Sequence, residues 1–81
     1  MIKHIYGYDY EVVSTESAKR AILNCSAFHE VKDLPTHSEK VWEQIWWKVA
    51  VLNEHDELWM NNCDGEILIL TDGPESYYRR F

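Results

Sequence analysis

The chain has little of what usually marks an enzyme or a secreted domain: of its 81 residues, three are glycine, two are proline and two are cysteine. The three glycines form no phosphate-cradling or dinucleotide-binding pattern. Cys25 and Cys63 can form at most one disulfide, and so low a count is typical of a reducing cytosol. No apolar run approaches the roughly 20 residues that cross a bilayer. We therefore expect a soluble, cytoplasmic protein that is not an enzyme and holds no cofactor.

Lysine and arginine are missing from one long segment, Val49 to Tyr78. The carboxylates of this segment are Glu54, Asp56, Glu57, Asp64, Glu66, Asp72 and Glu75. Together with the formal net charge of -6, they produce a negative field that attracts basic protein surfaces and repels nucleic acid and anionic lipid. The expected partner is therefore a protein with a basic surface, with no direct nucleic acid and no membrane.

The residues that are present suit a small folded domain. Aromatic side chains make up 14% of the chain, which is a composition for burial rather than for disorder. A chain of this length closes one hydrophobic core but not two, so residues 1–81 are expected to form a single domain. Such a core commonly supplies only ~3–5 kcal/mol of net stability, which makes burial against a partner or a second copy useful.

The first third of the chain predicts a strand followed by a helix. Residues Ile2 to Val13 alternate in polarity and are rich in β-branched and aromatic side chains, as strands are, with room for a bend at Gly7. Ser14 or Thr15 offers an N-cap, and apolar residues then recur at helical spacing. This pattern predicts a helix from about Thr15 to Phe28.

A short second helix is predicted after Pro35. Thr36 and Glu39 satisfy the capping-box pattern, and apolar residues recur at helical spacing as far as Trp46. The end of this helix is ambiguous, because the residues from Trp47 onward also alternate as a strand does.

The remainder predicts sheet. A polar turn at 53–56 and the Asp64-Gly65 hairpin signal separate three runs with strand character. The runs are Trp47 to Leu52, Glu57 to Asn62 and Glu66 to Thr71, and they form a three-stranded antiparallel meander. The predicted class is therefore α+β, with an antiparallel sheet (the N-terminal strand plus the C-terminal meander) packed against one long and one short helix. The tail Glu75 to Phe81 follows.

Alternation gives the meander two faces. The face expected to meet the helix carries Val49, Val51, Leu58, Met60, Ile67 and Ile69. The opposite face carries Trp59, Leu68 and Leu70 beside acidic residues, which is the makeup of an interaction surface with an apolar centre and a polar edge. Alternatively, the N-terminal strand, the second helix or the tail covers this second face.

Metal binding and catalysis have little support. The side chains of zinc-ligating type are Cys25, His29, His37, His55 and Cys63, but the sequence has no CxxC or HxxxH pair to hold a metal. Cys63 lies next to a carboxylate, which raises the pKa of a thiol and makes it a poor nucleophile. No metal site and no catalytic residue is predicted, and a small metal-binding module stays as a second alternative.

The predicted partner-binding site lies at one end of the meander. Its two turns at that end bring five carboxylates together, and two tryptophans are added because aromatic side chains concentrate binding energy at interfaces. The residues are Glu54, Asp56, Glu57, Trp59, Asp72, Glu75 and Trp46. The carboxylates would set encounter rate and specificity, while aromatic burial would supply affinity.

These features favour a small acidic protein-binding module, an inhibitor or modulator that docks on a basic, nucleic-acid-binding surface of its partner. In size, charge and the Ser-Thr-Glu-Ser-Ala-Lys-Arg helix start at 14–20, the chain is similar to the acidic inhibitors that phages and mobile elements encode. These include anti-CRISPR proteins, and toxin-neutralising immunity proteins have the same character. The resemblance implies an antagonist, and it transfers no motif residue by residue. The alternative from another class is a homo-oligomeric accessory subunit, such as a homodimer, joined through Trp59, Leu68 and Leu70.

Overall fold

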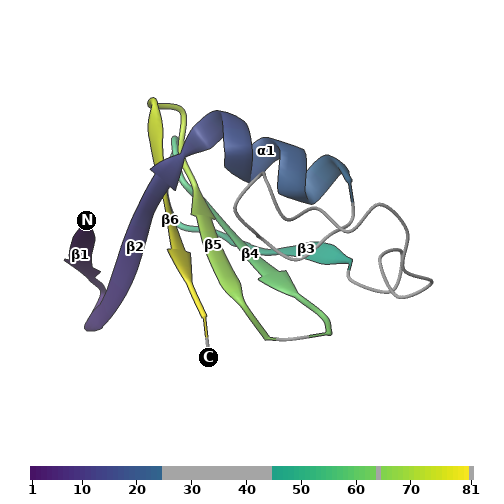
Figure 1. Ribbon diagram of the computed structural model, residues 1–81, viewed down its shortest axis with the longest axis horizontal. Helices are drawn as coiled ribbons and strands as arrows, with labels where there is room; N and C mark the ends of the chain where they lie inside the picture. Colours follow the sequence, from purple (N-terminus) through teal and green to yellow (C-terminus); the bar gives the residue numbers. More distant parts are fainter. Residues whose placement is uncertain (25–44, 64, 81) are drawn as a thin grey trace.

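The computed structural model describes residues 1–24, 45–63 and 65–80, and within them it shows a six-stranded antiparallel sheet with a helix on one face (Figure 1). The strands are β1 (Ile2–Ile5), β2 (Tyr8–Ser14), β3 (Trp46–Val51), β4 (Glu57–Asn61), β5 (Ile67–Leu70) and β6 (Glu75–Arg79), and helix α1 spans Thr15–Leu23. The order across the sheet is β1-β2-β6-β5-β4-β3. The last strand in sequence therefore lies in the middle, between β2 and β5.

The expected fold, a sheet packed against one long and one short helix, is wrong. In the described residues the sheet has six strands and the helix is single and short. Trp46 begins β3 instead of ending a helix, because pairing with β4 suits its β-branched and aromatic run better than the helical spacing does. Most of the predicted second helix, and the predicted end of the first helix at Phe28, lie outside the described residues.

Residues Glu75–Arg79, for which the sequence predicts no strand, form the central strand β6. Its residues pair with β2 on one side and with β5 on the other. Tyr77 and Tyr78 have high strand propensity, but the segment is short and contains Ser76 and Arg79. Contacts with two strands that are distant in sequence, rather than local preference, make it a strand.

The predicted N-terminal strand is a hairpin. Ile5 pairs with Tyr8, and the two residues between them turn the chain. Tyr6 and Gly7 have φ values of 50° and 84°, as a two-residue hairpin turn with both central residues at positive φ requires. The bend allowed at Gly7 is therefore a complete reversal of direction.

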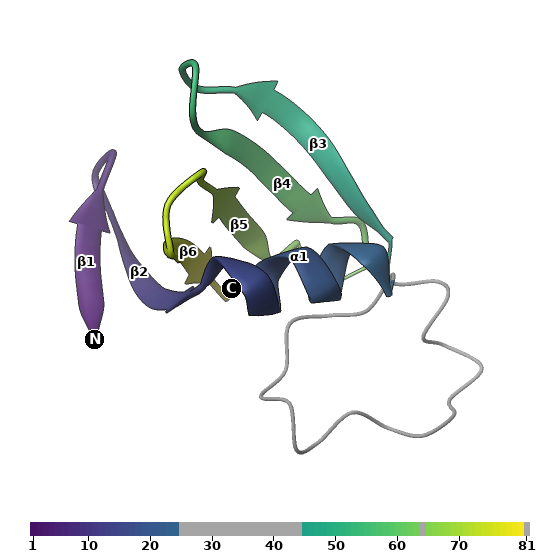
Figure 2. The same ribbon diagram turned by 90° about the horizontal axis from the view of Figure 1, so that it is seen from above.

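Helix α1 begins where its N-cap predicts. The Ser17 backbone N–H donates to the Ser14 hydroxyl oxygen at 3.1 Å, which satisfies a donor that the first helical turn leaves open. The buried side chains of the helix are small ones, Thr15, Ala18 and Ala21. Their size lets the helix lie close against β2, β5 and β6, as Figure 2 shows.

The meander is confirmed, and the faces of β4 and β5 are grouped as predicted but reversed relative to the helix. The grouping predicted for β3 is wrong, because a register shift between Lys48 and Ala50 pairs Ala50 with Leu58 and Val51 with Glu57. The buried cluster around α1 consists of Ala18, Trp46, Leu68 and Tyr78, with Trp59 and Leu70 packed against it. Register pairs Leu58 with Ile69 and Met60 with Ile67 on the other side of the sheet. Periodicity separates the faces, but both faces of this sheet are apolar, so it does not show which of them meets the helix.

Side-chain hydrogen bonds stabilise the position of β6 beneath the helix. The Thr15 and Ser76 hydroxyls share a buried hydrogen bond of 2.6 Å. The Tyr78 hydroxyl donates to the buried carboxylate of Glu66, and Arg80 Nε donates to the same Tyr78 oxygen at 3.1 Å. Each of these groups is thus paired with another polar group, which avoids the cost of burying it alone.

Candidate functional site

Two turns meet at one end of the sheet and carry the carboxylates that the sequence analysis grouped. Asp72, in the turn between β5 and β6, accepts a hydrogen bond from His55, in the turn between β3 and β4, when Nδ1 is protonated; the distance is 2.8 Å. Glu54, Glu57 and Asp72 line a polar hollow of about 230 Å³ between these turns, together with Lys19 of α1. We name the five carboxylates at this end of the sheet the acidic end: Glu54, Asp56, Glu57, Asp72 and Glu75.

The carboxylates of the acidic end differ in their hydrogen-bond partners and in their exposure to solvent. Asp56 accepts a hydrogen bond from Asn53 Nδ2 at 2.9 Å inside its own turn. Glu57 is half-buried, lies 3.4 Å from Lys48 Nζ and accepts the indole N–H of Trp59 at 3.3 Å. The Glu54, Asp72 and Glu75 residues are exposed. The exposed members are therefore the part of the acidic end that an approaching partner would meet.

The two tryptophans of the predicted site lie beneath the helix. Trp46 is 5% exposed within the core, and Trp59 is half-buried against that core. The exposed tryptophan among the described residues is Trp47, at 58%. Sequence reasoning missed it, although the alternation of β3 already placed Trp46 and Trp47 on opposite faces of the sheet.

Strand β3 carries exposed apolar side chains along the edge of the described sheet, from Trp47 to the acidic end. Trp47, Val49 and Val51, which we name the β3 strip, are 58%, 51% and 66% exposed. Among the described strands β3 is at an edge of the sheet, and Val51 also lines the polar hollow. The register against β4 shifts between Lys48 and Ala50, so Val49 lies at a bulge. Trp47 pairs with Met60 and Val51 with Glu57, so these two side chains follow the edge on opposite faces of the sheet.

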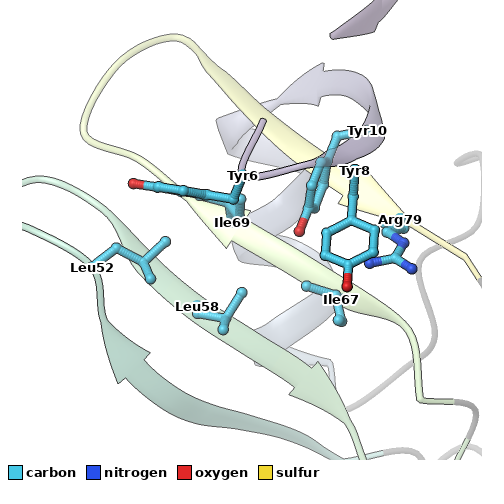
Figure 3. Close-up of a pocket in the computed structure, with 8 residues that line it drawn as sticks. All are labelled: Tyr6, Tyr8, Tyr10, Leu52, Leu58, Ile67, Ile69 and Arg79. Carbon is cyan, nitrogen blue, oxygen red and sulfur yellow. The ribbon is translucent and has the colours of Figure 1, made fainter. Parts of the chain in front are cut away.

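A second hollow, of about 380 Å³, lies on the far face, which is the sheet face away from α1 (Figure 3). It is lined by Tyr6, Tyr8, Tyr10, Leu52, Leu58, Ile67, Ile69 and Arg79. Arg79 is the charged member of this lining, and its guanidinium carbon lies 3.8 Å from the centre of the Tyr8 ring. The far-face hollow is therefore mainly apolar, with a single cation.

Metal-ligating side chains are not gathered into a group within the described residues. These residues hold no group of three His, Cys, Asp or Glu side chains placed to share a metal ion. Burial raises the pKa of Tyr78 well above its usual range, and the hydrogen bond to Glu66 raises it further, so this phenol stays protonated and is no base at neutral pH. Cys25, His29 and His37 lie outside the described ranges.

Comparison with protein family models, with curated proteins and with solved structures gives no match to this chain. Within residues 1–24, 45–63 and 65–80, no helix has the length and apolarity that a membrane span requires. The candidate sites are thus the acidic end with the β3 strip, and the far-face hollow.

Proposed function

We propose that the protein is a non-catalytic protein-binding module that docks on a basic surface of its partner through the β3 strip and the acidic end. The observation that carries this proposal is the exposure of three apolar side chains along the edge strand β3, the last of which, Val51, lines the polar hollow together with Glu54 and Asp72. An apolar centre with a charged rim is the makeup of a protein interface. Singly scattered apolar residues would need no such explanation, but neighbouring ones on an edge strand do.

The two parts of this surface have different roles. The exposed carboxylates Glu54, Asp72 and Glu75 attract a basic partner over a distance and so raise the association rate. Trp47 supplies a large ring that loses its contact with water on docking, which slows dissociation. An inhibitor or antagonist of a nucleic-acid-handling protein fits this division, because its carboxylates would occupy a groove that otherwise receives phosphates.

The bulge in β3 favours docking through side chains rather than through backbone pairing. A partner strand added to β3 would need a regular row of N–H and C=O groups. The register shift at Val49 interrupts that row, and bulges on edge strands are a common device against strand addition. We therefore assign the contact to the side chains of the β3 strip.

The test compares variants on a partner purified from cells of the source organism. Glu54→Lys with Glu75→Lys is expected to lower the association rate constant by about tenfold or more at low salt and to flatten its salt dependence. Trp47→Ala is expected to raise the dissociation rate by a similar factor and to leave the association rate near wild type. Surface-biosensor kinetics measures both constants.

The matched control is Asp9→Lys with Glu11→Lys, which changes the net charge equally on the exposed part of β2. Its association rate should stay well above that of the Glu54 and Glu75 pair. If the two double variants bind alike, the acidic end has no special role. If Trp47→Ala also dissociates as slowly as wild type, the proposed surface is wrong.

A homo-oligomeric subunit is the second candidate, and the exposed apolar strip on an edge strand is the observation that favours it. The surface first expected for this role, Trp59, Leu68 and Leu70, packs beneath α1 instead. Sedimentation velocity separates the candidates. A monomer of 9.7 kDa supports docking on another protein. A wild-type dimer that dissociates to monomers in the Trp47→Ala variant supports the homo-oligomeric subunit.

A further inference from the structure

The far-face hollow is built by two distant parts of the sheet. Tyr6 comes from the turn between β1 and β2, and Leu52 directly follows β3, yet both line the same space. Strands β1 and β3 are the edges of the described sheet, so the sheet curls enough to bring its two ends around a hollow over the strands between them. Figure 3 shows Leu52 and Leu58 on one side of the hollow and the three tyrosines and Arg79 on the other.

The floor and walls of this hollow are apolar. Ile69, 2% exposed, lies at its base, and Leu52, Leu58 and Ile67 are half-buried around it. Ligand sites in proteins are mostly hollows of roughly 300–1,000 Å³ with apolar walls and few polar groups. The volume of about 380 Å³ is at the lower end of that range. At about 30 Å³ for each non-hydrogen atom, which is the share of a water in the liquid, it holds roughly a dozen atoms, the size of a two-ring aromatic molecule.

One buried polar group at the hollow lacks a partner within the protein. Tyr10, from β2, is 4% exposed and lines the hollow, and within the described part of the chain its hydroxyl makes no hydrogen bond. Figure 3 shows this hydroxyl directed toward the middle of the lining residues. A buried tyrosine hydroxyl usually finds a partner, because leaving it unpaired costs free energy. A ligand that brings a hydrogen-bond acceptor to this position supplies the partner that the protein does not.

Tyr6 lines the same hollow in a backbone conformation that its side chain disfavours. Its φ is 50°, in the left-handed region where residues with a Cβ are strained, and a hairpin turn of this kind prefers asparagine, aspartate or glycine there. Burial does not offset the strain, since Tyr6 is 65% exposed. Residues held in such conformations cluster at sites that clamp ligands. A flat ring in the hollow would give the exposed Tyr6 ring an aromatic partner.

The charge of the lining favours an uncharged ligand. Arg79 is the charged residue among those that line the hollow, and it is already engaged. Its guanidinium carbon lies 3.8 Å from the centre of the Tyr8 ring, and Arg79 takes part in a further interaction. An anion would have to compete with these contacts, and a cation would be repelled by the guanidinium.

We propose that the far-face hollow binds a small, uncharged aromatic molecule that carries a hydrogen-bond acceptor. The rings of this ligand lie over Ile69 and against Tyr6, and its acceptor atom receives the Tyr10 hydroxyl. The site is separate from the surface of the proposed function, since no residue of the β3 strip or of the acidic end lines it.

The experiment is a titration of the whole chain with quinoline at pH 8, where this two-ring probe is uncharged, followed by amide chemical shifts in two-dimensional NMR. The shifts should fall on Tyr8, Tyr10 and Ile67 rather than on α1. Tyr10→Phe removes only the hydroxyl and is expected to weaken quinoline binding by about two- to tenfold, the effect of one hydrogen bond. The same variant should leave the binding of naphthalene unchanged, because naphthalene has the shape of quinoline without its acceptor.

Stability measurements on two variants separate binding from folding. Tyr10→Phe should unfold at no lower urea concentration than wild type, because the hydroxyl that it removes has no partner within the described part of the chain. Tyr6→Asn should be more stable than wild type, since asparagine suits a positive φ in this turn. It should nevertheless bind quinoline about threefold or more weakly, because it removes an aromatic ring from the lining.

The matched control is Tyr77→Phe, which removes a hydroxyl from the same face of the sheet, where Tyr77 pairs with Ile69 but does not line the hollow. It should bind quinoline as wild type does. N-methylquinolinium, which has the same rings with a positive charge and no ring lone pair, should bind more weakly than quinoline.

Several results would overturn the proposal. Quinoline would fail to bind in the millimolar range, its shifts would fall on α1, or N-methylquinolinium would bind as tightly as quinoline. The role of the Tyr10 hydroxyl would be wrong if Tyr10→Phe left quinoline binding unchanged, if it weakened quinoline and naphthalene alike, or if Tyr77→Phe had the same effect.

Discussion

At the scale of single residues, the contact between Tyr78 and Glu66 joins β6 to the residue that precedes β5, beneath the helix. Tyr78 is 5% exposed and Glu66 is 3% exposed, and the tyrosine hydroxyl donates to the carboxylate. Arg80 approaches the same phenol oxygen with its Nε. Because burial and the hydrogen bond to Glu66 both favour the neutral phenol, the pKa of Tyr78 lies above its usual value.

This raised pKa predicts a loss of stability in alkali. The unfolded chain releases the Tyr78 proton near pH 10, whereas the folded chain retains it to higher pH, so the stabilisation is complete below about pH 10 and is lost above it. The free energy of unfolding should therefore fall by up to about 1.4 kcal/mol per pH unit above pH 10 through this one group.

Urea unfolding of wild type and Tyr78→Phe at pH 8 and pH 11 measures the effect. The variant should be the less stable protein at pH 8, and the difference should shrink or change sign at pH 11. Tyr77→Phe is the control, because Tyr77 is only half-buried and its hydroxyl accepts from the exposed Lys3 instead of donating to a buried carboxylate. An equal response of both variants to pH would contradict the assignment to Tyr78.

At the scale of elements, the β1–β2 hairpin depends on one glycine. Gly7 has a φ of 84°, and a Cβ added there would meet nothing within 4 Å. The added methyl group of Gly7→Ala therefore meets no steric clash. Because alanine is strained at positive φ, the substitution should lower the free energy of unfolding by about 1 kcal/mol. Thermal or urea unfolding measures this loss of stability.

Gly73→Ala is the matched control for the hairpin. Gly73 has no positive φ, and its added Cβ would lie 3.7 Å from the Thr71 hydroxyl oxygen, an ordinary contact. The substitution should leave stability unchanged or raise it by a few tenths of a kcal/mol, because it restricts the unfolded chain. Equal destabilisation by both substitutions would show that the hairpin conformation is not the cause.

Local patterns predicted the elements that depend on local chemistry. The Ser14 cap marks the start of α1, and the turns at 53–56 and at Gly65 separate the meander strands. Strand β6 could not be predicted in this way, because two strands distant in sequence determine it. The short run from Trp46 fits both the helical and the strand period, and only the pairing with β4 decides between them.

The candidate sites also contain features that local patterns predict and features that depend on the whole sheet. The acidic end was predictable, since turns at one end of an antiparallel meander must lie together. The exposed Trp47 required the correct assignment of β3, and the reversal of the two faces required the position of α1. The far-face hollow needs the curl that brings Tyr6 near Leu52, and that curl depends on the full sheet rather than on any segment.

At the scale of the whole molecule, β5 and β6 are flanked by strands on both sides, whereas β1 and β3 are edges of the described sheet. Amides of Leu68 and Tyr78 should therefore exchange with solvent only when the whole protein unfolds. For a domain of this size, that corresponds to slowing by roughly a hundredfold to several thousandfold. Amides of Lys3 and His4 should exchange much faster, through local opening of β1.

Hydrogen exchange followed by two-dimensional NMR tests this prediction. A mild destabiliser, such as a low concentration of urea, should accelerate exchange at Leu68 and Tyr78 in parallel. Exchange at Lys3 should respond little to urea, because local opening exposes little new surface. Fast exchange at Tyr78 in the native protein would show that β6 opens independently of the sheet.

The central place of β6 also has a consequence for how the protein folds. Val12 pairs with Tyr77 and Glu11 with Tyr78, so the middle of the sheet joins residues from opposite ends of the chain. Pairing at such separation must overcome the entropy of closing a long loop before it gains any contact energy, and proteins rich in such contacts fold slowly. We expect the β1–β2 hairpin and the meander to form early and separately, with the arrival of β6 as the slow step that joins them.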